Sequence, residues 1–385
     1  MALTEQHGTK ITFANQLRGF AVICVVITHY LGIYWFARPL VAQYILAPVA
    51  QSPTPSLVYH ILPPTFNPGP FGVGLFFLIS GFVIPFTLEK LGIIRFAVAR
   101  ILRIFPTYWS ATAVMLFSVW LSGKYWGNHF SFNIHQIVTN LLLIHMQAFQ
   151  PSIDLVNWTL AIEIMFYVIA ILMSPFIKRR SAIALVSYSL AVLAFLTWAP
   201  VAWGLIHPGG ITISIDATKY ELMFTTFLFI GTLFNFAHRL SISVGTLIGA
   251  TIAMFLSFCM MWQKTVLADQ FWLVPANYGY ALVVFSVCYA FRHRFRPSKI
   301  LDFFADVSYP LYIIHSVTGY AIIRFSMVYG LGAYAAMATA TAISIAVAYL
   351  LHIGVEKPTA NLGKNLFRTK NSVHSDRRAV PAVPE

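Results

Sequence analysis

Residues 13–36 read FANQLRGFAVICVVITHYLGIYWF, an apolar run of membrane-spanning length that carries Arg18 and His29 within it. At about 1.5 Å and about 100° per residue, the eleven-residue step between these two side chains makes about three helical turns, so they share one helix face about 16 Å apart. An Arg near the bilayer centre costs roughly 2.5–3.5 kcal/mol on insertion scales. Because ionisable residues inside a membrane helix are costly, the pair predicts a functional site.

The composition of the whole chain is that of a membrane protein. Of its 385 residues, 58% are hydrophobic and only 10% are charged, whereas soluble domains have about 25% charged residues. Segment 136–149 is apolar but too short to cross, so we expect it to be re-entrant or interfacial. The predicted fold is an all-α, polytopic membrane bundle of about ten transmembrane helices, near 13–36, 71–88, 106–122, 156–176, 181–201, 220–238, 243–262, 272–291, 307–328 and 332–355.

The net charge of +13 does not indicate a nucleic-acid partner. Most of the 25 Lys and Arg residues fall in short loops and in the tail, on the side that holds the N-terminus, which is the positive-inside pattern. We therefore expect a protein integral to the plasma (bacterial inner) membrane with both termini cytoplasmic. The predicted organisation is a cytoplasmic N-terminal segment 1–12, a membrane domain 13–360 and a disordered basic tail 361–385.

Three cysteines, Cys24, Cys259 and Cys288, all lie in apolar segments. An odd number without paired spacing favours neither a disulfide framework nor a zinc site. The histidines also lack the spacing of metal ligands, so we expect no metal.

Arg18 and His29 have two interpretations. Arg18 can be a snorkelling residue at the inner boundary, and His29 can bond a neighbouring carbonyl. Alternatively, Arg18 binds phosphate and His29 moves a proton near neutral pH.

Glu163, in NWTLAIEIMFY at 157–167, is the sole acid well inside any predicted span. Thr159 and Tyr167 flank it at four-residue spacing on one face. The carboxylate is expected about 10 Å below the outer face, near the depth of His29. It is either a structural partner of an Arg or His elsewhere in the bundle, or the group that orients His29 as a base.

Two further stretches carry polar candidates. Arg100 and Arg103 in RFAVARILRIFPTYW share a helix face suited to phosphates, although positive-inside anchoring also explains basic residues there. In SYPLYIIH at 308–315, Tyr312 and His315 share a face with Ser308. Small residues in GVGLFFLISGFVIPF at 72–86 predict close helix packing.

In order and spacing, LRGFAVICVVITH, FFLISGF, RILRIFPTY, WTLAIEIMFY and SYPLYIIH resemble acyltransferase family 3. These integral-membrane enzymes acylate O-antigens, Nod factors, other glycans and macrolides. The resemblance implies an acyl-CoA co-substrate, often acetyl-CoA, no permanently bound cofactor, and a carbohydrate, glycolipid or small-molecule hydroxyl as acceptor.

Carried over to this chain, the resemblance makes His29 the base and Glu163 a site acid. It also implies that the acyl-CoA donor is contacted by Arg18, Arg100 and Arg103. Asn15 and Gln16 stand where many members carry an acidic residue, which leaves Arg18 without a nearby carboxylate. Further residues expected to line the site are Ser80, Trp158, Tyr167, Tyr309, Tyr312 and His315.

The hypothesis is direct transfer of an acyl group from cytoplasmic acyl-CoA, with His29 as general base oriented by Glu163. The competing class is a proton-coupled or anion transporter that uses the same intramembrane ionisable residues as a relay. A structural subunit of polysaccharide export explains the buried polar residues least well.

Overall fold

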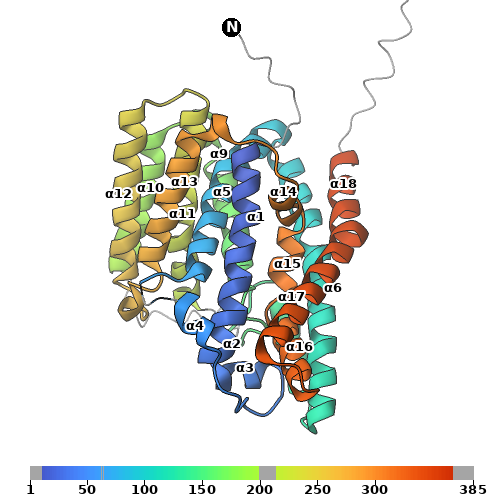
Figure 1. The fold of residues 1–385 in the computed structure, drawn as a ribbon. Helices are drawn as coiled ribbons and strands as arrows, with labels where there is room; N and C mark the ends of the chain where they lie inside the picture. The colour runs from blue at the N-terminus through green and yellow to red at the C-terminus, as the bar shows by residue number, and fades with distance from the viewer. Residues whose placement is uncertain (1–10, 62, 64, 199–213, 367–385) are drawn as a thin grey trace, which may run out of the picture.

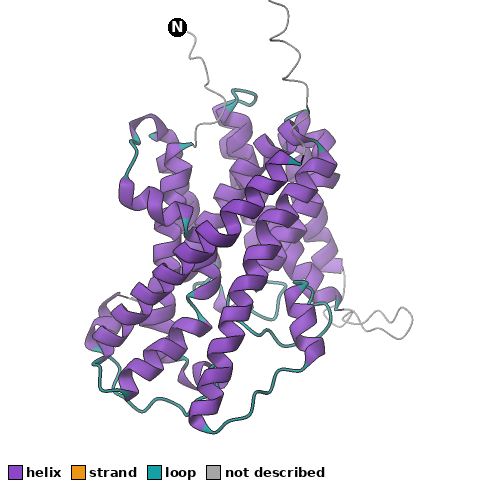
Figure 2. Cartoon of the chain, turned by 90° about the vertical axis from the view of Figure 1, so that its right-hand side faces the viewer, coloured by secondary structure: helices purple, strands orange, loops and turns teal. Residues whose placement is uncertain are grey.

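The protein is helical throughout the part of the chain that the structure describes. The structure is a computed structural model that describes residues 11–61, 63, 65–198 and 214–366. These residues include no β-strand, and the longer helices run side by side in one bundle (Figures 1 and 2). The all-α prediction is confirmed. Most of the predicted N-terminal segment and all of the predicted tail from residue 367 onward lie outside the described residues.

Seven helical segments among the described residues are long and apolar enough to cross a membrane. An eighth forms if α15 (Ser308–Ile314) and α16 (Val317–Val328), which meet at 60°, count as one broken span. α8 (Trp158–Leu172) and α10 (Ala182–Trp198) lie at two further predicted spans but are shorter. The count of about ten is therefore not confirmed. The seven segments are Thr12–Phe36, α5 (Pro68–Leu91), α6 (Ile93–Trp126), α11 (Ile215–His238), α12 (Val244–Trp262), Ala268–Ala290 and Ala333–Gly363.

Shorter elements complete these segments and connect them. α7 has eight residues, too few to cross, in line with the expectation for 136–149. The remaining described elements are α1 (Thr12–Ile27), a π-helix (Thr28–Ile33), α2 (Tyr34–Phe36), α3 (Arg38–Tyr44), α4 (Ser56–Ile61), α7 (Ile134–Leu141), α9 (Ser174–Lys178), a 3-10 helix (Ala268–Gln270), α13 (Pro275–Ala290), a second 3-10 helix (Arg292–Arg294), α14 (Lys299–Asp306), α17 (Ala333–Leu351), a second π-helix (His352–Glu356) and α18 (Lys357–Asn365).

The centre of the bundle is the packing of α5 against α1 and α11. A Cβ atom at Gly81 would lie 1.7 Å from the carbonyl oxygen of Leu228, and one at Gly231 would lie 2.1 Å from that of Leu78. On the other side of α5, a Cβ at Gly72 would lie 2.7 Å from the carbonyl oxygen of Ala21. Only glycine allows these backbones to approach so closely, so the close packing predicted for 72–86 is confirmed.

Pro85 interrupts the hydrogen bonds of α5, and α11 compensates for the loss. A proline has no N–H, so the carbonyl of Gly81, four residues earlier, loses its helical donor. Thr232 Oγ1 donates to that carbonyl at 3.0 Å, and Asn235 Nδ2 donates to the carbonyl of Phe82 at 2.8 Å. Both side chains are buried, as is required for polar groups in a membrane bundle.

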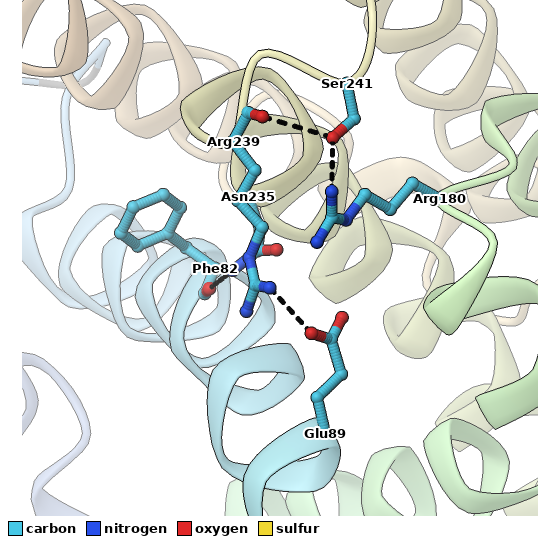
Figure 3. A network of polar contacts seen from close by, with 6 residues as sticks. All are labelled: Phe82, Glu89, Arg180, Asn235, Arg239 and Ser241. Carbon is cyan, nitrogen blue, oxygen red and sulfur yellow. Dashed lines mark hydrogen bonds and ion pairs between the residues drawn. The ribbon is translucent and has the colours of Figure 1, made fainter.

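One end of the same contact carries a network of charged and polar groups (Figure 3). Arg239 Nη1 lies 2.6 Å from Glu89 Oε2 in an ion pair between α5 and the end of α11. Arg180 Nη1 donates to Ser241 Oγ at 2.8 Å. Structural contacts thus hold both arginines at the end of the bundle where α5 and α11 finish.

The opposite end is closed by connecting segments that fold onto the bundle. Arg38 donates to the carbonyls of Trp35, Ala50 and Ser52 at 2.7–3.0 Å, which organises the proline-rich segment after α2. The segment 142–157 turns inward, because Asn157 is fully buried and its Nδ2 donates to Asn140 Oδ1 at 2.8 Å. This inward turn sets the position of α8, which follows it.

Candidate active site

His29 lies where α1 changes into a wider helical turn. The π-helix Thr28–Ile33 continues directly from α1, and such turns are frequent at functional sites. His29 is buried, and its Nδ1 lies 2.6 Å from the hydroxyl oxygen of Tyr320 on α16. The two rings are stacked with centroids 5.9 Å apart. Tyr320 therefore fixes the orientation of the imidazole.

His315, directly after α15, faces His29. Their ring centroids lie 4.6 Å apart with the planes at 81°. His315 Nδ1 lies 2.9 Å from the carbonyl oxygen of Leu311, and a carbonyl can only accept, so Nδ1 carries the hydrogen in this contact. Nε2 is buried and has no hydrogen-bond partner among the described residues. The structure thus places an unpartnered polar nitrogen beside His29.

The contact with Tyr320 determines which nitrogen of His29 can act as a base. If the Tyr320 hydroxyl donates to Nδ1, then Nε2 carries the hydrogen and is a donor. If Nδ1–H donates to the Tyr320 oxygen, then Nε2 is an acceptor, which is the form a general base needs. The 2.6 Å contact fits either tautomer, so His29 can take up a proton at Nε2 while it keeps its partner.

Arg18 lines a small cavity between α1, α5, α8 and α15, which has both apolar and polar residues in its wall. The cavity has a volume of about 50 Å³. Glu163 lies in the same cavity and interacts favourably with the guanidinium, as does Glu356. The expectation that Arg18 lacks a nearby carboxylate was therefore wrong. The polar residues that line the cavity are Arg18, Ser80, Thr159, Glu163, Ser308, Tyr309 and Tyr312.

Glu163 belongs to this cavity and not to the immediate surroundings of His29. It accepts hydrogen bonds from Ser80 Oγ at 3.4 Å and from the hydroxyl of Tyr167. Within the described part of the chain, no hydrogen bond joins it to His29, so the prediction that Glu163 orients His29 was wrong. Because 142–157 folds inward, α8 begins inside the bundle, and Glu163 lies at the level of Arg18 instead of His29.

Arg100 and Arg103 bring two more guanidinium groups toward Arg18. Arg100 is buried, with its guanidinium carbon 5.2 Å from the ring centroid of Phe96 and 5.5 Å from that of Tyr167. Its Nε makes no hydrogen bond to any described residue. Arg103 is half-buried and close enough to repel both Arg18 and Arg100. The three guanidinium groups thus lie near two carboxylates, those of Glu163 and Glu356. The resulting net positive charge is suited to binding an anion.

Tyr312 connects this cationic cavity to the histidines. It lines the cavity, its hydroxyl lies 2.9 Å from Thr159 Oγ1, and its ring centroid lies 5.9 Å from that of His315.

Trp158 does not line the cavity and packs on Phe224 with ring centroids 5.6 Å apart. Of the predicted lining residues, Ser80, Tyr309 and Tyr312 line the cavity, Tyr167 bonds Glu163, and His315 faces His29.

Tyr320, Tyr30 and Asp154 belong to the site but were not identified from the sequence. The Tyr30 hydroxyl donates to the carbonyl oxygen of His315 at 2.8 Å, and Asp154 accepts a hydrogen bond from Ser316. Tyr30 lies directly beside His29 in the sequence, which is a signal that could have identified it. Asp154 could have been found as an acid in an otherwise uncharged segment before α8.

Metal binding has no support in the geometry of the described residues, because no three His, Cys, Asp or Glu side chains are grouped to hold an ion.

Comparisons with known proteins found one family and one relative with a described role. The family described as an acyltransferase domain matches residues 11–353. The exopolysaccharide production protein ExoZ of Rhizobium meliloti (strain 1021) is 23% identical over 309 residues, which cover 78% of this chain and 92% of that protein. No solved structure matches this chain.

Proposed function

Because this chain belongs to acyltransferase family 3, whose domain matches residues 11–353, we propose that it transfers an acyl group from a cytoplasmic acyl-CoA to a carbohydrate hydroxyl, with His29 as general base. The acyl group proposed is acetyl. One observation carries the proposal: the cationic cavity around Arg18 and the histidine pair are joined through Tyr312, which contacts both. The relative whose printed name concerns exopolysaccharide production supports a carbohydrate acceptor.

Donor binding uses the positive charge at the end where α1 begins. Phosphates of acyl-CoA are bound by Arg18, Arg100 and Arg103, since guanidinium groups pair with phosphate through charge-assisted hydrogen bonds. The buried Nε of Arg100 has no protein partner among the described residues and is free to donate. A cavity of about 50 Å³ has room only for water, so it must widen to admit the thioester arm.

The chemical step takes place at His29. Its Nε2 removes the proton from the acceptor hydroxyl while Nδ1–H donates to Tyr320. The oxygen attacks the thioester carbonyl, the new C–O bond forms, the C–S bond breaks, and the thiolate leaving group takes the proton back from His29. The acyl group passes directly to the acceptor.

Each observation that fits a transporter is also explained by acyl transfer. The intramembrane Arg18 and His29 are accounted for by donor binding and proton transfer, and Glu163 by its hydrogen bonds from Ser80 and Tyr167 beside Arg18. We therefore propose a single function.

The test is mass spectrometry of surface glycans and small-molecule products from a strain in which the gene is deleted. We expect a product that lacks one acetyl group, restored by the wild-type gene but not by His29→Ala. His60→Ala is the matched control, because this exposed histidine on α4 makes its hydrogen bond within its own helix, to the carbonyl oxygen of Ser56. Unchanged acylation in the deletion strain, or full restoration by His29→Ala, would overturn the proposal.

A further inference from the structure

Asp154 is a buried acid that the proposed mechanism does not yet use. It lies in the inward-folded segment 142–157, and its side chain is only 4% exposed. Its Oδ1 accepts hydrogen bonds from the backbone N–H of Leu155 at 2.7 Å and from the hydroxyl of Ser316. It forms no ion pair with any described residue.

The hydroxyl that Asp154 binds lies at the break between α15 and α16. Ser316 directly follows His315 and directly precedes α16, and both residues are fully buried. Tyr320, which holds His29, lies one turn further on and donates its N–H to the carbonyl of Ser316 at 3.0 Å. Fixing Ser316 therefore fixes both of the residues that contact the His29 ring.

Among the described residues, no positively charged group acts on Asp154. The titratable groups near it are the phenols of Tyr44, Tyr108, Tyr312 and Tyr320, from α3, α6, α15 and α16, all uncharged at neutral pH. His29 itself faces the titratable ring of His315, with ring centroids 4.6 Å apart. A buried carboxylate without a cation is costly, and the nearby groups that can become positive during turnover are the two histidines.

We propose that Asp154 is a positioning residue for the histidine pair: through Ser316 it sets His315 and Tyr320 against His29, and its negative charge stabilises the imidazolium that forms when His29 takes a proton. This inference rests on the proposed function, because it assigns a role in proton transfer at the same site. The arrangement parallels the general use of a carboxylate to orient and stabilise a catalytic histidine, with one serine and one turn of helix between the two groups.

The ionisation of Asp154 gives this role a pH dependence. Burial raises the pKa of this carboxyl to about 6. Above that pH the carboxylate is charged and supports the imidazolium, whereas below it the group takes up a proton and the charge is lost. We therefore expect the acyl-transfer rate of the wild type to fall as the pH falls through about 6.

The decisive variant is Asp154→Asn, which keeps an oxygen that can accept from Ser316 but removes the charge. We expect a transfer rate at pH 7.5 lowered by about tenfold or more, and a pH–rate profile without the inflection near pH 6. We also expect a thermal midpoint no lower than that of the wild type, because the variant no longer buries an unpaired charge. A purely structural carboxylate would lower the midpoint and leave the shape of the pH profile unchanged.

Glu221→Gln is the matched control, since Glu221 is also a buried carboxyl that is bonded at 2.7 Å to an uncharged partner, Gln147. It should leave the pH–rate profile as in the wild type. Wild-type rate and profile in Asp154→Asn, while His29→Ala is inactive, would overturn the role of Asp154 and leave the proposed function intact. Full activity of His29→Ala would instead overturn the proposed function itself.

Discussion

Replacing Tyr320 with Phe removes the hydroxyl that lies 2.6 Å from His29 Nδ1 and changes little else. A neutral hydrogen bond contributes about 0.5–1.5 kcal/mol, and one to a charged group about 1.5–3 kcal/mol. The barrier to acyl transfer is lowered only by the amount by which the Tyr320 hydrogen bond becomes stronger when His29 is protonated. From the two ranges above, this difference is about 1–1.5 kcal/mol. Tyr320→Phe should therefore reduce the rate of acyl transfer by roughly tenfold.

The assay is the initial rate of transfer from radiolabelled acetyl-CoA in membrane vesicles that contain the native acceptor. Tyr34→Phe is the control, because this buried tyrosine lies beside Tyr320 with ring centroids 6.0 Å apart. The hydrogen bond of its hydroxyl goes to the sulfur of Met327, at 3.8 Å. We expect Tyr34→Phe to stay near the wild-type rate. A wild-type rate for Tyr320→Phe, or equal losses in both variants, would refute the reasoning.

Two more predictions concern the donor site and the bundle. Arg100→Ala should raise the KM for acetyl-CoA about tenfold or more, because a charge-assisted contact to phosphate is lost. Arg179→Ala, at an exposed position, should leave the KM unchanged. Equal KM values for the two variants in steady-state kinetics would contradict the assignment of Arg100 to acyl-CoA binding. Gly81→Ala should destabilise the protein by about 1–3 kcal/mol, since its Cβ would meet the Leu228 carbonyl oxygen at 1.7 Å. The control is Gly249→Ala, whose Cβ would meet nothing within 4 Å. Thermal unfolding in detergent measures both variants, and equal midpoints would contradict the packing argument.

Hydropathy and residue type were sufficient to predict the helical bundle and most of the polar side chains that the candidate site brings together. The positions of the apolar runs follow from the length needed to cross a bilayer, so α5, α11 and α12 lie close to their predicted spans. α6 contains the predicted span 106–122 but begins earlier, at Ile93. Arg18 and His29 were identified because ionisable groups in such helices are rare. The short α8 and α10 show the limit of this approach, since apolar composition alone does not fix helix length.

The contacts between helices could not be predicted from a single sequence. The depth assigned to Glu163 assumed that α8 starts at the membrane surface, but the inward fold of 142–157 lowers it to the level of Arg18. The sequence predicted a single span near 307–328, whereas the chain bends by 60° at the break after α15, next to His315. The partners of His29 come from residues 315 and 320, almost 300 positions away, and no local pattern reveals such a pairing.

The central claim is that His29 carries the proton in acyl transfer from acyl-CoA. The most direct measurement is the release of free thiol from acetyl-CoA by purified protein in lipid nanodiscs, with an added fraction of the native acceptor, for the wild type and for His29→Ala. We predict acceptor-dependent release by the wild type and a loss of about 10²–10⁴-fold in the variant, with acetyl-CoA still raising the thermal midpoint of both. Thiol release by His29→Ala at the wild-type rate would contradict the account.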